Sequence, residues 1–147
     1  MAQFHHTGLT VSNLERALAF WSDALGAEIV MQQERQGGYF EEIVGEHGVD
    51  VRTVHVAFGG EGPRVELFEF RSPRGGNVAG RAADVGFAHV CVTCDDLDAM
   101  LERLVAAGGR PVSEPVYIDG GANAGGRAVY VRDPDGHTVE LFAPAAS

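Results

Sequence analysis

The sequence predicts an α+β fold made of two tandem copies of one unit, in which a strand and a helix are followed by three more strands. Two observations predict this duplication. The tetrapeptide Val-Glu-Leu-Phe occurs at residues 65–68 and again at residues 139–142, each time as an apolar run that contains one acidic residue. A single shift along the chain also superposes His6 on His89, together with the helix-forming segments that follow them. Because side chains alternate along a strand, the glutamate and the phenylalanine of each copy are expected on one strand face.

The first module begins with an alternating strand and a helix. Ser12-Asn13-Leu14-Glu15 has the spacing of a capping box, which predicts a helix start at this point. Apolar residues at helical spacing continue to Leu25, and Gly26 is placed to end the helix. Residues 39–48 fit either a short strand or a helical turn. The strands of this module are expected at residues 4–11, 27–33, 49–58 and 64–70.

The second module repeats this plan. Asp95 or Asp96 is expected to cap its helix, whose apolar stripe covers residues 97–105. Asp133-Pro134-Asp135-Gly136 predicts a tight turn between its last two strands. Its extended segments are expected at residues 86–93, 110–117, 128–132 and 137–142, with a glycine-rich loop at 118–126. The single domain, residues 1–147, thus consists of a βαβββ module at 4–71, a glycine-rich linker at 72–85 and a second βαβββ module at 86–144.

The composition is typical of a soluble globular protein and argues against two classes of partner. The chain has 147 residues, of which 45% are hydrophobic and 22% charged, and its formal net charge is −10. Nucleic acid is not an expected partner, because phosphate binding needs a basic surface. A membrane is not expected either, because no apolar run approaches the roughly 20 residues that span a bilayer. The N-terminal sequence lacks the regions of a signal peptide, so a cytoplasmic protein is expected.

The two cysteines, Cys91 and Cys94, have the C-x-x-C spacing of some redox motifs. Such a motif normally begins a helix. Cys91 instead lies in a stretch typical of a strand, where positions three apart face opposite sides. We therefore interpret the pair as two buried thiols in a reducing compartment.

Two histidines and two glutamates are related by the repeat and form a candidate metal site. His6 and His89 lie in the first strand of each module, and Glu66 and Glu140 lie in the last. Two neutral imidazoles and two carboxylates are a suitable ligand set for a divalent transition metal. Three further histidines, His5, His47 and His137, have no repeat partner and are interpreted as structural.

The chain resembles the vicinal oxygen chelate superfamily, which includes glyoxalase I, methylmalonyl-CoA epimerase, extradiol dioxygenases and fosfomycin resistance enzymes. The matching stretches, which span almost the whole chain, are His5-His6-Thr7-Gly8-Leu9-Thr10-Val11, Phe20-Trp21 to Leu25-Gly26, Val65-Glu66-Leu67, Ala88-His89-Val90, Asp133-Pro134-Asp135-Gly136 and Val139-Glu140-Leu141. The resemblance implies the glyoxalase/bleomycin resistance/dioxygenase fold, in which eight strands form an open cleft around one divalent ion. It also implies a homodimer and Ni, Co, Mn, Fe or Zn as the ion.

The resemblance further implies a metal-dependent isomerase, epimerase or lyase. Such an enzyme removes a proton next to a metal-bound carbonyl and passes through an enolate. We expect Glu140 to be the primary base and Glu66 its partner on the opposite face. Glu42 is a substitute, because the second catalytic glutamate of the epimerases lies in a segment similar to residues 40–43. His55, on the third strand, competes for this role.

Two other functions remain open. The resemblance also covers Fe(II)-dependent dioxygenases, in which oxygen binds the metal. It covers drug-binding proteins of the bleomycin-resistance kind too, which use the cleft without a metal. The partner is in each case a small molecule, and for the enzymes a carbonyl or vicinal-oxygen compound. The candidates for binding an anionic part of it are Arg35, Arg52, Arg71, Arg74 and Arg127.

Overall fold

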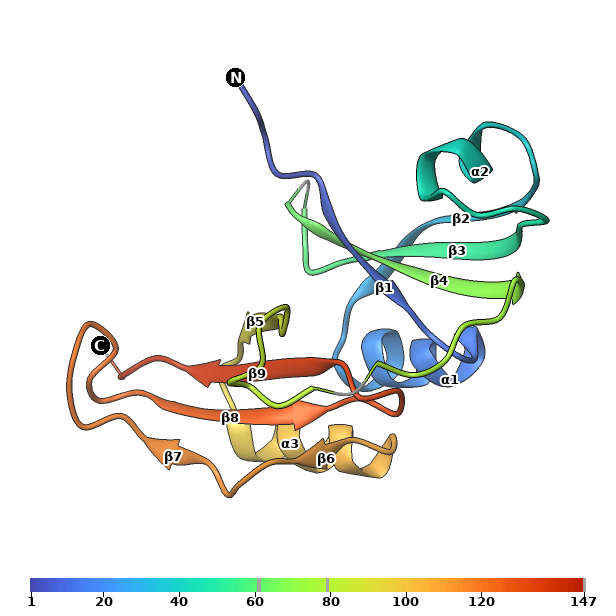
Figure 1. Cartoon of the computed structure of the whole chain (residues 1–147). Coiled ribbons are helices and arrows are strands. Elements are labelled where there is room, and N and C mark those ends of the chain that lie inside the picture. Colours follow the sequence, from blue (N-terminus) through green and yellow to red (C-terminus); the bar gives the residue numbers. More distant parts are fainter. Residues whose placement is uncertain (61, 79, 147) are drawn as a thin grey trace. The chain divides into compact units, whose positions relative to one another are not determined.

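The computed structural model describes residues 1–60, 62–78 and 80–146 of the chain. They divide into two compact units, Met1–Asn77 and Val78–Ser147 (Figure 1). In each unit a strand and a helix precede the remaining strands. The predicted α+β fold with two βαβββ modules is therefore confirmed.

The first unit is built on a four-stranded sheet. Its strands lie in the order β1-β4-β3-β2, with β1 parallel to β4 and the other neighbours antiparallel. The elements are β1 (His6–Thr10), α1 (Leu14–Leu18), the π-helix η1 (Ala19–Ala24), β2 (Glu28–Gln36), α2 (Tyr39–Val44), β3 (Asp50–Ala57) and β4 (Arg64–Ser72). The ambiguous segment thus begins with a helix, α2. Phe40 attaches α2 to the sheet, because its ring stacks on those of Phe68 and Phe70.

The start of α1 differs by one residue from the capping-box prediction. Asn13, not Ser12, is the cap: its Oδ1 accepts a hydrogen bond of 2.8 Å from the backbone N–H of Arg16. Glu15 does not complete a box, because its carboxylate pairs with Arg52 on β3. Both Ser and Asn are favourable N-cap residues. The choice between Ser12 and Asn13 as the cap of α1 therefore depends on where β1 ends.

Most of the predicted apolar stripe that follows is buried. Leu14 and Trp21 have no exposed surface, Leu18 is half-buried, and α1 lies against β4. The helix widens in η1, where the N–H of Leu25 donates to the carbonyl oxygen of Phe20 over 2.9 Å. Gly26 then ends the helix with a φ of +87°, a conformation that residues with a side chain rarely adopt.

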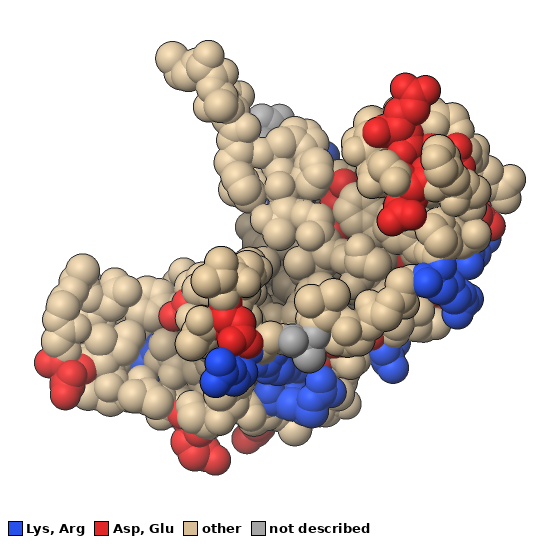
Figure 2. Space-filling model, viewed as in Figure 1, with Lys and Arg blue, Asp and Glu red and all other residues tan. Residues whose placement is uncertain are grey.

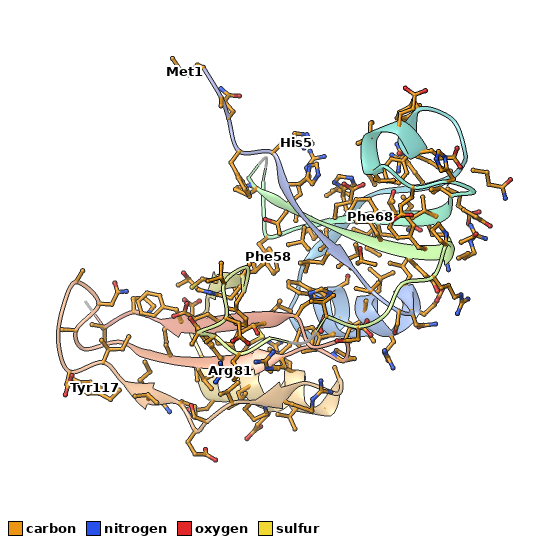
Figure 3. The ribbon with its side chains drawn as sticks, viewed as in Figure 1. Met1, His5, Phe58, Phe68, Arg81 and Tyr117 are labelled. Carbon is orange, nitrogen blue, oxygen red and sulfur yellow. The ribbon has the colours of Figure 1, made fainter. Side chains whose placement is uncertain are left out.

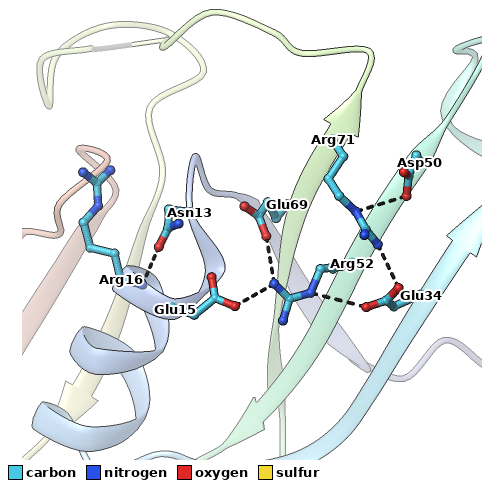
Figure 4. A network of polar contacts seen from close by, with 8 residues as sticks. All are labelled: Asn13, Glu15, Arg16, Glu34, Asp50, Arg52, Glu69 and Arg71. Carbon is cyan, nitrogen blue, oxygen red and sulfur yellow. Dashed lines mark hydrogen bonds and ion pairs between the residues drawn. The ribbon is translucent and has the colours of Figure 1, made fainter.

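Charged residues on the α1 side of the sheet form an ion-pair network (Figure 4). The guanidinium of Arg52 lies 2.6 Å from Glu15 and 3.4 Å from Glu69. Arg71 lies 2.9 Å from Glu34, which also approaches Arg52. Since most of these side chains are substantially exposed, each ion pair contributes little to stability. The network nevertheless pairs both arginines with carboxylates.

The second unit has the same plan with one broken strand. Its strands lie in the order β5-β9-β8-β6, β7 also pairs with β8, and β5 is parallel to β9. The elements are β5 (His89–Thr93), α3 (Leu97–Ala106), β6 (Arg110–Pro111), β7 (Val116–Tyr117), β8 (Arg127–Arg132) and β9 (Thr138–Ala143). The described residues therefore form nine strands rather than eight. The single strand expected at 110–117 is divided because Pro111 and Pro115 cannot donate hydrogen bonds to β8.

The helix and the turn of the second unit follow the sequence. Asp96 is the cap, since its Oδ1 accepts from the N–H of Ala99 over 3.0 Å. The turn at Asp133 closes as predicted, with the N–H of Gly136 donating to the Asp133 carbonyl oxygen. In the stripe of α3, Leu97 and Leu104 are buried and Met100 and Leu101 are half-buried, but Val105 at its end is 46% exposed, against prediction. Of the helices in the described parts of the chain, none has the length and apolar character to cross a membrane.

The cysteines also correct one expectation. Both are free thiols, but Cys94 is buried whereas Cys91 is exposed. Cys91 lies within β5, as predicted, and Cys94 follows the last residue of the strand. The prediction that both are buried was wrong, because Cys91 shares the face of β5 that carries His89.

Candidate functional site

The first predicted pair, His6 and Glu66, is brought together by the parallel pairing of β1 and β4. Gly8 lies opposite Glu66 in this register. His6 lies two residues before Gly8 on β1, and so points to the same face of the sheet as Glu66. The Nε2 atom of His6 is 3.1 Å from Oε2 of Glu66. Glu66 is only 6% exposed, whereas His6 is accessible. A buried carboxylate is costly unless it is paired, and this one has two partners.

The second partner of Glu66 is His55, which lies directly opposite it on β3. The Nε2 atom of His55 is 3.1 Å from Oε1 of Glu66, and His55 is 3% exposed. Burial lowers the pKa of His55 more than the charge of Glu66 raises it, so the ring is neutral at pH 7. Its Nδ1 is buried without a hydrogen-bond partner among the described residues. The proton therefore belongs on Nε2, where it is donated to Glu66.

His5 contacts the other side of the His6 ring. The Nδ1 atoms of the two rings are 2.7 Å apart, so one donates a hydrogen bond to the other. Figure 3 shows His5 at the N-terminal end of β1. A histidine that binds a metal through Nε2 normally donates its Nδ1 proton to a neighbouring acceptor, and His5 can serve as that acceptor. His5, interpreted from the sequence as structural, thus touches the candidate site.

An aromatic surface extends from Glu66 along the same face of β4. Phe68 stacks on Phe70 with 6.2 Å between ring centroids, and on Phe40 of α2 with 6.0 Å. The ring of Phe68 packs so closely on β1 that a Cβ atom on Gly8 would lie 2.9 Å from its Cε2. Gly8 is thus required by the position of Phe68.

Replacing Gly8 by Ala is therefore expected to destabilise the protein by about 1–3 kcal/mol, because the Phe68 ring must move from a packed position. Thermal or urea denaturation measures this effect. Gly75→Ala is the matched control, since a Cβ at Gly75 meets no atom within 4 Å. Equal stability of the two variants would show that the Phe68 ring adjusts without cost.

The second predicted pair, His89 and Glu140, has the same arrangement in the other unit. The Nε2 atom of His89 is 3.0 Å from Oε2 of Glu140. Cys91 lies opposite Glu140 on β5, and Tyr130 lies opposite it on β8. The Tyr130 ring also packs against His89, with 5.0 Å between centroids. Tyr130 therefore holds in this unit the place that His55 holds in the first.

Cys91 and Tyr130 are both affected by the carboxylate between them. Partial burial, followed by the charge of Glu140 and a hydrogen bond to it, raises the pKa of Cys91 to about 11. Burial and the same charge raise the pKa of Tyr130. Both side chains are thus protonated at neutral pH and can donate hydrogen bonds toward Glu140.

Alkylation of Cys91 tests this arrangement. In metal-free protein carrying Cys94→Ala, reaction with iodoacetamide at pH 9 should be about 50-fold slower than in an unstructured peptide, because little thiolate is present. Adding Glu140→Gln removes the negative charge and should accelerate the reaction. A rate equal to that of the peptide, unchanged by Glu140→Gln, would place the thiol away from Glu140.

The residues of each pair fit a metal ion. Separations of 3.0 and 3.1 Å are those expected between neighbouring ligands about 2.1 Å from one ion, and they also suit N–H···O hydrogen bonds. Each unit contributes one pair, and no group of three or more metal-binding side chains is found in the described part of the chain. Glu42, the third predicted acid, is exposed on α2.

The sequence did not single out Tyr130 or Cys91 as neighbours of Glu140. The signal was present in the turn at 133–136, because a hairpin closed by that turn places Tyr130 opposite Glu140. The parallel strand then adds Cys91, which is the repeat counterpart of Gly8. Register arguments of this kind need the turn type as well as the strand positions.

Comparisons with known proteins agree with the fold. Residues 3–141 match the profile of the Glyoxalase/Bleomycin resistance protein/Dioxygenase superfamily. A protein named 2-epi-5-epi-valiolone epimerase, from an Actinomyces species, is 33% identical over 144 residues, which cover 94% of this chain and 77% of that protein. A lactoylglutathione lyase of Salmonella typhimurium is 25% identical over 93% of this chain and 89% of its own length. A plant relative, a lactoylglutathione lyase of Arabidopsis thaliana, is 25% identical, and this chain spans 44% of it.

Solved structures show the same fold at low sequence identity. A glyoxalase family protein of Bacillus cereus superposes with a TM-score of 0.87 at 21% identity, covering 99% of this chain and 96% of that one. Glyoxalase I of Zea mays gives a TM-score of 0.71 at 21% identity, covering 99% of this chain and 46% of that chain.

Proposed function

Because the chain belongs to the Glyoxalase/Bleomycin resistance protein/Dioxygenase superfamily, we propose that it is a metal-dependent isomerase, epimerase or lyase acting next to a carbonyl. The observation that carries the proposal is the pair of repeat-related His–Glu contacts, His6 with Glu66 and His89 with Glu140. We propose that these four side chains bind one divalent ion, Ni, Co, Mn, Fe or Zn. The relatives named epimerase and lactoylglutathione lyase support chemistry of this class.

The bound ion would supply Lewis-acid stabilisation of an enolate oxygen. His6 and His89 would act as ligands only, because a neutral imidazole has one free lone pair and gives it to the metal. A carboxylate can bind through one oxygen and accept a proton on the other. The proton-transfer roles therefore fall to the glutamates.

Glu140 is the better primary base of the two. Both oxygens of Glu66 already contact imidazoles, His6 on one and His55 on the other. Glu140 is half-buried, and one of its oxygens contacts His89. It also has a hydrogen bond with the Cys91 thiol, a weak donor, so it is held less firmly than Glu66. Glu66 is then the partner on the opposite face of the substrate, and Glu42 on α2 is the third candidate. Aromatic rings next to Glu66 exclude water and strengthen charge stabilisation there.

The substrate is proposed to be a small carbonyl or vicinal-oxygen compound, and the protein a cytoplasmic homodimer. Light scattering at micromolar concentration tests the dimer independently of the chemistry.

The experiment that tests the function is proton exchange. Metal-loaded protein is incubated in D₂O with a panel of 2-oxo and 2-hydroxy carbonyl compounds, and NMR follows deuterium entry next to the carbonyl. Exchange that chelation abolishes and metal restores is expected for at least one compound. Oxygen consumption with a catechol, without exchange, would indicate a dioxygenase instead. Ligand binding that needs no metal, again without exchange, would indicate a drug-binding protein.

A further inference from the structure

The five arginines that are candidates for binding an anionic substrate differ in what they contact. Arg52 and Arg71 belong to the ion-pair network on the α1 side of the sheet (Figure 4). Arg127 pairs with an aspartate of α3 over 2.6 Å. Arg74 is exposed. Arg35 is the exception, because it is half-buried and has no carboxylate at ion-pair distance among the residues that the structure describes.

Neutral groups hold the guanidinium of Arg35 in place. Its Nη1 donates to Oγ1 of Thr53 over 3.1 Å, and its Nη2 donates to Oε1 of Gln33. Its central carbon lies 5.2 Å from the centroid of the Phe40 ring. Such contacts orient the planar group but leave its positive charge uncompensated.

Arg35 lies on the sheet face that carries Glu66. Directly opposed residues of neighbouring strands point to the same side, and the register runs from Arg35 through Val51 to Phe70. Phe70 lies four residues beyond Glu66 on β4, and therefore on the same face. The guanidinium turns back toward Thr53, which is one alternate position from His55. The charge therefore stands about 7 Å along the strand direction from the His55–Glu66 level.

The surroundings favour a carboxylate over a phosphate. A guanidinium fork matches the two oxygens of a carboxylate, and one unbalanced charge neutralises one negative charge. Acidic side chains gather over α2, which contains Glu41 and Glu42 (Figure 2). A phosphate group with two negative charges would be repelled there more strongly than a carboxylate group with one. Arg64 is the rival on this face, two residues from Glu66, but no side-chain hydrogen bond fixes it within the described chain.

We propose that Arg35 binds a carboxylate of the substrate at a point displaced about 7 Å, along the strand direction, from the oxygens that the His6–Glu66 side of the site receives. The substrate class is then an oxo or hydroxy acid whose carboxylate lies several carbons from the reacting carbonyl. This inference rests on the proposed function in one respect, that the carbonyl end of the substrate binds at the metal site.

Binding of two probes to the metal-loaded protein tests it. 2-Oxoadipate and 2-oxohexanoate share the 2-oxo acid end and differ in a distal carboxylate against a methyl group. Calorimetry should show 2-oxoadipate binding at least about 10-fold more tightly, because it adds a charge-assisted hydrogen bond. Arg35→Gln should remove this preference, Arg35→Lys should retain part of it, and Arg74→Gln should retain all of it.

Three results would overturn the role of Arg35. The first is equal binding of both probes by the wild type. The second is a preference for 2-oxoadipate that survives Arg35→Gln but is lost in Arg64→Gln. The third is tighter binding of inorganic phosphate than of 2-oxoadipate. Metal-dependent binding without a distal preference would leave the proposed function standing while Arg35 fails. A preference that depends on Arg35 but not on metal would support Arg35 and count against the metal-dependent function.

Discussion

Replacing Glu140 by Gln should slow deuterium exchange next to the substrate carbonyl by at least about 100-fold, the lower range for loss of a general base. The amide oxygen of Gln still binds a metal, and a similar shape fits beside His89, so the fold and most of the metal affinity should persist. The measurement is the exchange rate by NMR, with metal content and melting temperature determined on the same samples.

The matched variants are Glu66→Gln and Glu42→Gln. Because Glu66 has both oxygens engaged by imidazoles, its substitution should affect exchange at the opposite face and weaken metal binding as well. Glu42 is exposed, so its substitution should have the smallest effect. If Glu140→Gln exchanges at the wild-type rate while one of the others does not, the base has been assigned to the wrong glutamate. If none of the three matters, proton transfer is not the reaction.

Replacing His55 by Leu should weaken metal affinity by about 10–100-fold, although His55 is not proposed as a ligand. Without the Nε2 proton of His55, the second oxygen of the buried Glu66 has no donor, so its orientation toward His6 is lost. The same loss should destabilise the metal-free protein by about 1–3 kcal/mol. Competition with a chelator measures the affinity, and denaturation measures the stability.

His55→Gln provides the control for this effect. Gln carries an N–H donor at a similar distance from the backbone, so it should recover most of the metal affinity that His55→Leu loses. If Leu and Gln weaken metal binding equally, the hydrogen bond to Glu66 is irrelevant and His55 contributes only packing.

The pairing of the candidate residues was predictable because it follows from strand order. The repeated tetrapeptide identified Glu66 and Glu140, and the shift between the modules identified His6 and His89. In each unit the first and last strands lie side by side, so these residues meet. The internal repeat was therefore enough to predict this long-range pairing, and the helix or strand propensity of single residues was not needed.

Features that depend on tertiary contacts were not predictable in the same way. Helix α2 forms where Phe40 stacks on Phe68 and Phe70, and these partners lie far along the chain. The sequence did not distinguish Arg35 from the four other candidate arginines. Among the residues that the structure describes, three of the five pair with carboxylates, whereas Arg35 is half-buried against neutral groups and Arg74 is exposed. The exposure of Cys91 likewise depends on what covers one face of β5, which alternation alone does not reveal.

Metal titration of the chelator-treated protein tests the central claim, that the two His–Glu pairs serve one ion. Calorimetry should give one divalent ion per chain, and His6→Ala and His89→Ala should each abolish tight binding, because an ion with four protein ligands loses one in either case. The contradicting result is two ions per chain, with each variant retaining one, or tight binding that survives both substitutions.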